Sequence, residues 1–293
     1  MVQQVIKPDE GRLWKEELVH IERDRANYHV SPGYYLEIKT LPTAQPFHWL
    51  RLGLHDLGQH YAIAIGYGAV IALVYALIVG FTLSNQLYEV MIQLTAGFIL
   101  LAPMMALGFY GVSRKLERSE HVSFSDMFSV WRINPKGVLG MGLLIVLLFL
   151  TWFMVSMSTA AALAQGQEAL GAFLRADAYT NLTLPMALGY LSIGLVYMLV
   201  VFGFAAVSIP LLMDRPETDA ITALVISWNA VMHNWKPMLL WAVLIAVITA
   251  VGLAVFYVGL AITMPLLGFA SWHAYRDTLG EWREAEEKQP QYY

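Results

Sequence analysis

Six long apolar segments, each free of charged side chains, constrain the fold of this chain more than any other feature. A membrane-spanning helix needs about 20 mostly apolar residues to cross about 30 Å of hydrocarbon. None of the 22 acidic or 18 basic residues lies inside these segments. We therefore predict an all-α, polytopic membrane protein with six transmembrane helices. The segments are 61–83, 90–112, 137–164, 184–213, 237–253 and 255–275.

The composition agrees with a membrane protein and excludes several other classes. The chain is 58% hydrophobic and 14% charged, whereas soluble domains are about 25% charged. The absence of cysteine excludes disulfide frameworks, thiolate zinc sites, iron–sulfur clusters and thiol nucleophiles. The net charge of −4 gives no reason to expect a nucleic-acid partner. The N-terminus lacks the apolar core of a cleavable signal peptide.

The distribution of basic residues predicts the orientation. With six spans and a cytoplasmic N-terminus, every Lys and Arg except Arg175 lies in a cytoplasmic segment, as the positive-inside rule requires. We expect both termini to be cytoplasmic and 84–89 and 165–183 to lie outside. The predicted division is a partly ordered N-terminal segment (1–45), a membrane domain (46–279) and a cytoplasmic tail (280–293), which we expect to be a frayed helix followed by disorder.

The stretch 237–275 is the weak point of the six-span prediction. A single helix of this length would be about 58 Å long, so we expect a break near Gly252. The alternative is one tilted or kinked helix, giving five spans in all and an external C-terminus.

Three stretches share one pattern, which predicts a threefold repeat. In each, a cytoplasmic interfacial amphipathic helix precedes a transmembrane hairpin. Apolar residues recur at helical spacing over 47–61, 124–131 and 221–235. We expect these helices, with Trp49, Trp131, Trp228 and Trp235, to lie in the headgroup layer. Each unit ends on a helix with a kinking proline: Pro103, Pro210 and Pro265.

Three strings of residues resemble the motifs of a known family. They are APMMALGFYGVSRKLE (102–117), DAITALVISWN (219–229) and PLLGFASWHAYRD (265–277). Over about 47–280 the chain is similar to the family called domain of unknown function 2189. The resemblance implies an uncharacterised integral protein of the bacterial inner membrane and supplies no catalytic residues. Some relatives carry a cytochrome oxidase subunit I label, but all eight histidines here lie in cytoplasmic segments or at span ends. We therefore exclude a haem–copper oxidase core.

The remaining chemistry is sparse. The sequence contains no Gly-x-Ser-x-Gly motif of hydrolases and no His-Glu-x-x-His motif of metalloproteases. It also contains none of the glycine-rich loops by which common nucleotide-binding proteins hold phosphate groups. We expect no enzymatic activity, no metal and no cofactor. The favoured function is a non-catalytic accessory, scaffold or interaction component, which could include association with a respiratory complex. The alternative is a transporter or channel for a neutral or amphipathic solute or lipid. Expected partners are the lipid bilayer, including anionic head groups, and another membrane protein.

A polar network at the cytoplasmic face is the candidate site. Arg114 and Arg276 each follow a repeat proline by eleven residues, and each has a carboxylate close by. Two interpretations stay open: the charges extend separately to the head groups, or they pair across repeats and lock the bundle or bind an anionic head group. The candidate residues are Arg114, Glu117, Asp214, Asp219, His273, Arg276 and Asp277.

Overall fold

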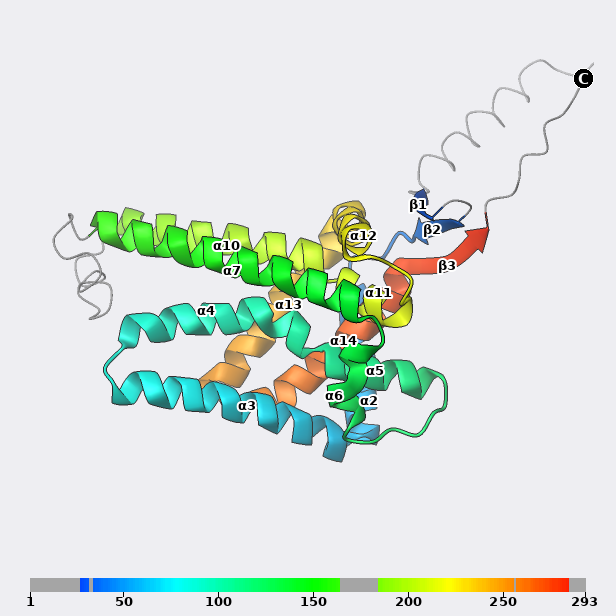
Figure 1. The fold of residues 1–293 in the computed structure, drawn as a ribbon, viewed down its shortest axis with the longest axis horizontal. Coiled ribbons are helices and arrows are strands. Elements are labelled where there is room, and N and C mark those ends of the chain that lie inside the picture. Colours follow the sequence, from blue (N-terminus) through cyan, green and yellow to red (C-terminus); the bar gives the residue numbers. More distant parts are fainter. Residues whose placement is uncertain (1–26, 32–33, 164–183, 256, 285–293) are drawn as a thin grey trace, which may run out of the picture.

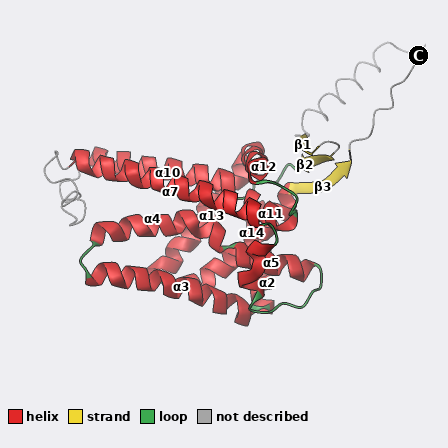
Figure 2. Cartoon of the chain, in the orientation of Figure 1, coloured by secondary structure: helices red, strands yellow, loops and turns green. Residues whose placement is uncertain are grey.

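The computed structural model describes residues 27–31, 34–163, 184–255 and 257–284. Residues 1–26 of the expected N-terminal segment, the expected external segment 165–183 and residues 285–293 of the expected tail lie outside the described residues. The described chain is mostly helical (Figure 2).

Four long helices run side by side along the long axis of the molecule (Figure 1). They form two packed pairs. The first is α3 (Tyr61–Ser84) with α4 (Tyr88–Met105), and the second is α7 (Pro135–Leu163) with α10 (Leu184–Ala205). Behind them α13 (Trp235–Ala254) runs obliquely and packs against α14 (Leu260–Thr278). The structure thus shows the helix pairs α3–α4 and α7–α10, whereas the threefold repeat of such units stays a prediction.

Among the described residues, five helical segments are long and apolar enough to cross a membrane. They cover most of the first five predicted segments, and the sixth, 255–275, is not among them. The helix there, α14, carries Ser271, His273, Arg276 and Asp277, and these polar residues lower its hydropathy. Its length is largely buried against α2, α3, α5 and α13. The five segments are Tyr61–Ser84, Gln93–Glu117, Pro135–Thr159, Leu191–Asp214 and Trp235–Ala254.

The stretch 237–275 forms two helices, because α13 ends at Ala254 and α14 begins at Leu260. Two glycines allow the close return of the chain. A Cβ atom on Gly259 would lie 2.8 Å from the carbonyl oxygen of Gly252. The alternative of one long helix is therefore wrong for this structure.

Two of the kinking prolines lie beside breaks in long helices. Pro103 lies inside α4, which α5 (Leu107–Glu117) continues after Ala106. Pro210 lies in α11 (Ser208–Asp214), which continues α10 after residues 206–207. Pro265, by contrast, lies within the unbroken helix α14.

Helical segments of different lengths occupy the three stretches where interfacial helices are expected, and their position at the membrane surface stays a prediction. They are α2 (Gln45–Gln59), the single turn α6 (Asp126–Ser129) with a 3-10 turn at Val130–Arg132, and α12 (Ala220–His233). The second is thus much shorter than expected. Trp49 is also not a headgroup anchor: it is fully buried, and its ring meets that of Trp241 edge-on at 5.6 Å.

A small antiparallel sheet departs from the all-α prediction. Its order is β1 (Asn27–Ser31), β2 (Tyr34–Ile38), β3 (Leu279–Glu284). Residues 280–284, expected as a frayed helix, are therefore a strand. Because β2 pairs with β3, segments from the two ends of the chain lie at the same end of the bundle. Leu36, Ile38 and Leu279 from this sheet join the main hydrophobic core.

Candidate functional site

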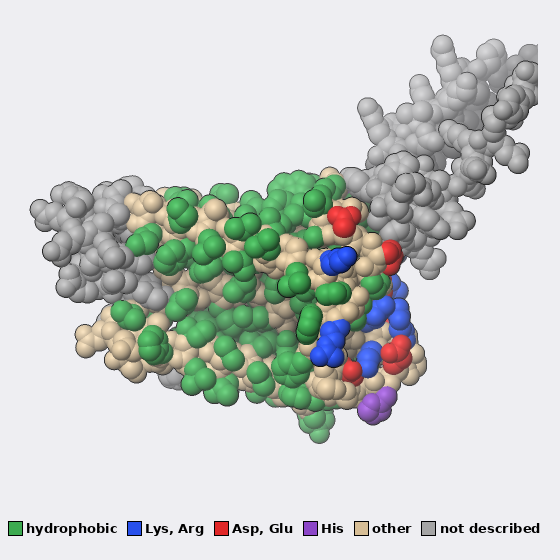
Figure 3. Space-filling model, in the orientation of Figure 1, with side chains coloured by type: hydrophobic (Ala, Val, Ile, Leu, Met, Phe, Trp, Pro, Cys, Tyr) green, Lys and Arg blue, Asp and Glu red, His purple; other side chains and the backbone are tan. Residues whose placement is uncertain are grey.

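The charged side chains gather at the end of the bundle that carries the sheet (Figure 3). Away from this end, the surface along the long helices carries mainly hydrophobic side chains on the face shown in Figure 3. Four helices deliver polar residues to the charged end: the C-terminal parts of α2, α5 and α14, and the end of α11.

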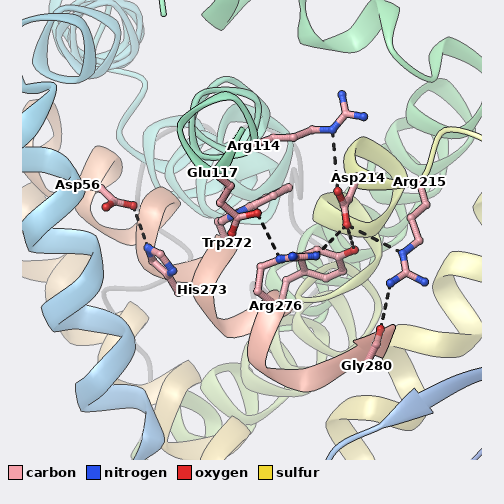
Figure 4. Close-up of polar contacts among 10 residues, drawn as sticks. Asp56, Arg114, Glu117, Asp214, Arg215, Trp272, His273, Arg276 and Gly280 are labelled. Atoms are coloured by element: carbon pink, nitrogen blue, oxygen red, sulfur yellow. Dashed lines mark hydrogen bonds and ion pairs between the residues drawn. The ribbon is translucent and has the colours of Figure 1, made fainter. Parts of the chain in front are cut away.

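Asp214, the last residue of α11, is the centre of an ion-pair network (Figure 4). Its carboxylate accepts a hydrogen bond from the Tyr275 hydroxyl at 2.8 Å and one from Nη1 of Arg276 at 3.3 Å. The Nε atoms of Arg114 and Arg215 each lie 3.9 Å from its oxygens. The Asp214 side chain is only 14% exposed, so solvent screens these charges less than it screens a surface pair.

Glu117 extends the network between α5 and α14. Its Oε1 accepts a hydrogen bond from the Trp272 indole at 2.9 Å, and its Oε2 lies 3.3 Å from Nε of Arg276. Arg276 thus bridges Glu117 of α5 and Asp214 of α11. Separately, Arg215 donates to the backbone carbonyl of Gly280 at 3.0 Å, which ties α11 to β3. We define Arg114, Glu117, Asp214, Arg215, Tyr275 and Arg276 as the charged-end network.

A second pair joins α14 to α2. Nε2 of His273 lies 2.8 Å from Oδ2 of Asp56, and Nδ1 of His55 lies 3.6 Å from Oδ1 of the same carboxylate. His273 therefore belongs to this pair, and among the described residues it forms no ion pair with Asp214.

Between the His273–Asp56 pair and Glu117 lies a cleft of about 220 Å³, which we call the charged-end cleft. Its lining includes Asp56, Ser113, Leu116, Glu117, Trp272 and His273. Ser113 is 1% exposed, and its hydroxyl oxygen has no hydrogen-bond partner among the described residues.

Two of the candidate carboxylates have other roles. Asp219 is not part of the charged-end network: it caps α12 by accepting hydrogen bonds from the backbone N–H groups of Ile221 and Thr222 at 2.9 and 3.0 Å. The pKa of Asp219 is held below its ordinary value, chiefly by the Thr222 hydroxyl. Asp277 binds α2, through Nε2 of Gln45 at 2.7 Å and the Trp49 indole at 2.8 Å.

Sequence reasoning thus found the main charges but missed several of their partners. Asp56, Ser113 and Tyr275 carry no local signal for this role, because their partners lie far along the chain. Asp56 and His273, for example, are separated by 217 positions. Tyr275 could have been noticed only as part of the aromatic string that precedes Arg276.

The helices and their one-sided polar network define a multi-pass integral membrane protein. The family described as predicted integral membrane protein, domain of unknown function 2189, matches residues 90–214. The resemblance predicted from the sequence is therefore confirmed over these residues, which include Arg114, Glu117 and Asp214. The strings at 219–229 and 265–277 lie beyond the matched range. Comparisons with curated proteins and with solved structures give no match.

Proposed function

We propose that this protein is a non-catalytic accessory or scaffold component of the bacterial inner membrane, with both termini cytoplasmic and another membrane protein as its partner. The observation that carries the proposal is the way the helix breaks are closed. In transporters, broken helices expose backbone groups to a substrate or an ion at mid-membrane. Here neighbouring helices satisfy those groups instead.

The break between α10 and α11 is closed by a serine from α12. The backbone N–H of Val207 donates to Oγ of Ser227 at 3.1 Å, and the same hydroxyl donates to the Gly203 carbonyl at 2.8 Å. Ser227 is fully buried. Because the freed backbone groups bond to protein, this break is a packed kink of the kind that membrane helices tolerate.

The break between α4 and α5 is closed in the same manner from α3. The hydroxyl of Tyr67 donates to the Met105 carbonyl at 3.2 Å, immediately before the break. Tyr67 also meets Phe109 and Phe128 edge-on, at 5.1 and 5.2 Å between ring centroids. Aromatic packing therefore fills the space beside this break.

Close contacts at small residues further support a closed interior. A Cβ atom on Gly68 would lie 2.5 Å from the carbonyl oxygen of Ala261, and one on Gly53 would lie 2.8 Å from the backbone nitrogen of Ala270. Such seams are typical of permanently packed membrane helices. The charged-end network then fixes the ends of α5, α11 and α14 to one another.

Measurements of permeation and of complex formation distinguish the scaffold function from the transporter function. In liposomes that contain the purified protein, we expect the rate of glycerol-driven swelling to equal that of protein-free liposomes of the same lipid. Extraction in native-lipid particles should yield a second membrane protein at a constant molar ratio, and an unrelated multi-pass protein extracted in parallel should not yield it. Saturable, protein-dependent glycerol entry without a constant partner would contradict the scaffold proposal and favour the transporter.

A further inference from the structure

The charged-end cleft contains a buried hydroxyl that forms no hydrogen bond within the part of the chain that the structure describes. Ser113 lines the cleft, is 1% exposed, and has no hydrogen-bond partner for its Oγ among the described residues. Buried hydroxyl groups in native proteins almost always have a partner, because an unpaired one costs free energy. Ser113 therefore marks a place where a ligand can supply the missing bond.

The charge of the lining indicates which ligand fits. Asp56 and Glu117 both line the cleft, and none of the described Lys or Arg residues lines it. Asp56 already accepts a hydrogen bond from His273, and Glu117 accepts one from Trp272 and is also paired with Arg276. A carboxylate offers about four lone-pair sites, so both can accept further hydrogen bonds. An anion would meet like charge here, whereas a cationic donor meets acceptors.

The number of acceptors favours one class of cation. A primary ammonium has three N–H donors, and the cleft offers at least that many side-chain oxygens that can accept, from Asp56, Gln59, Ser113 and Glu117. A quaternary ammonium has no N–H and would leave the Ser113 hydroxyl unpaired. We infer that the charged-end cleft binds a small primary ammonium group, carried either by a free amine or by the head group of an ethanolamine lipid.

The position of the cleft is compatible with both sources. It lies at the charged end of the bundle, where α5 ends at Glu117 and where the apolar span Gln93–Glu117 also ends. A head group at the membrane surface and a free amine in solution can both reach this level. The proposal does not depend on the scaffold function, because a transporter with the same cleft would bind the same group.

Binding of three small probes tests the chemistry. Purified protein in detergent is titrated with ethanolamine, choline and ethylene glycol, and binding is measured by calorimetry. We expect ethanolamine to bind at least about tenfold more tightly than choline, because each hydrogen bond to a charged group is worth about a factor of ten or more. Ethylene glycol, which lacks the charge, should bind no better than choline.

Variants test the residues. Ser113→Ala and Asp56→Asn should each weaken ethanolamine binding about tenfold. Ser113→Ala removes no hydrogen bond among residues 27–31, 34–163, 184–255 and 257–284, and Asn can still accept from His273, so both variants should melt near the wild-type temperature. Glu120→Gln, which removes an exposed carboxylate outside the lining, should leave binding unchanged.

Lipid retention distinguishes the two sources. Protein is placed in bilayer discs of phosphatidylcholine with either phosphatidylethanolamine or phosphatidylglycerol, and retained lipids are counted by native mass spectrometry. Selective retention of phosphatidylethanolamine, lost in Ser113→Ala, identifies the lipid head group. Ethanolamine binding without lipid selectivity identifies a free amine. Equal binding of choline, no effect of Ser113→Ala, a preference for phosphatidylglycerol, or no binding of either amine source would overturn the inference.

Discussion

At the scale of single residues, the charged end is arranged around carboxylates that serve different partners. Asp214 faces three guanidinium groups and a tyrosine hydroxyl, whereas Asp277 and Asp56 each join α14 to α2. Exposed ion pairs contribute little to stability. Asp214 is 14% exposed and shared by several donors, so it should contribute more than a surface carboxylate.

Replacing Asp214 by Asn tests this expectation. The substitution leaves Arg114 and Arg276 without their shared counter-charge, and we expect a loss of about 3 kcal/mol in the free energy of unfolding. Glu217→Gln, an exposed carboxylate near the same helix end, should change stability by less than about 0.5 kcal/mol. Denaturation in detergent, followed by circular dichroism, measures both. Equal effects of the two variants would remove Asp214 from its central role.

Because Asp219 caps α12 through its carboxylate, we predict that the stability of the folded protein depends on pH. The pKa of Asp219 is lower in the folded protein than its ordinary value of 3.8, so its stabilisation is complete above that value and is lost as the pH falls through the folded-state pKa. Asp219→Ala should lower stability by about 1 kcal/mol at neutral pH. The difference from wild type should shrink below about pH 4.

Asp219→Asn is the matched control, because Asn caps helices without titrating. Melting temperatures of the three proteins between pH 3 and pH 7 provide the measurement. A gap between wild type and Asp219→Ala that stays constant down to pH 3 would show that the carboxylate does not act through its charge.

At the scale of helices, most of the large apolar residues predicted as the 221–235 stripe face outward, and smaller residues of α12 face the bundle. On α12, Ile221 is 76% exposed and Trp235, just beyond its end, is 56% exposed. The buried positions include Ala223, Ser227 and Ala230. In a membrane, large side chains gain as much from lipid as from protein, so helices pack through small residues. The helical period was therefore predicted correctly, but it did not identify the packed face.

Two glycines of α3 provide a matched test of this packing. Gly68→Ala would place a Cβ atom 2.5 Å from the Ala261 carbonyl, an oxygen that has no i+4 donor because residue 265 is proline. We expect a destabilisation of about 1–3 kcal/mol. Gly80→Ala meets open space within 4 Å and should be neutral or stabilising by up to about 1 kcal/mol. Thermal unfolding in the same detergent compares them, and equal melting temperatures would contradict the close seam.

At the scale of the whole molecule, the sheet holds a segment from near the N-terminus beside a segment from near the C-terminus. Residues 34–38 pair with 279–284, and Lys39 donates its backbone N–H to the Thr278 carbonyl at 2.9 Å. Asn234, before α13, also binds this region through the Leu41 N–H and the Lys39 carbonyl. The segments before α2 and after α14 therefore lie on one side of the bundle.

Single-cysteine labelling tests the orientation, and the cysteine-free chain needs no background removed. Glu120→Cys lies at the charged end and Ser84→Cys at the opposite end, and both positions are exposed. In spheroplasts, we expect a membrane-impermeant maleimide to label Ser84→Cys, and to label Glu120→Cys only after the membrane is permeabilised. Both variants should be labelled fully in detergent. The reverse pattern in spheroplasts would contradict a cytoplasmic charged end.

From the sequence alone we predicted where the apolar helices run, which segments carry charge, and that 237–275 breaks near Gly252. The sequence also identified Arg114, Glu117, Asp214 and Arg276 as candidates. These features depend on composition and period along the chain, which are local properties. The three-dimensional arrangement was needed to find that α14 is enclosed by other helices, that His273 pairs with Asp56, and that segments from both ends of the chain share a sheet. Those contacts depend on how distant helices pack, and packing through small residues leaves no periodic signal in the sequence.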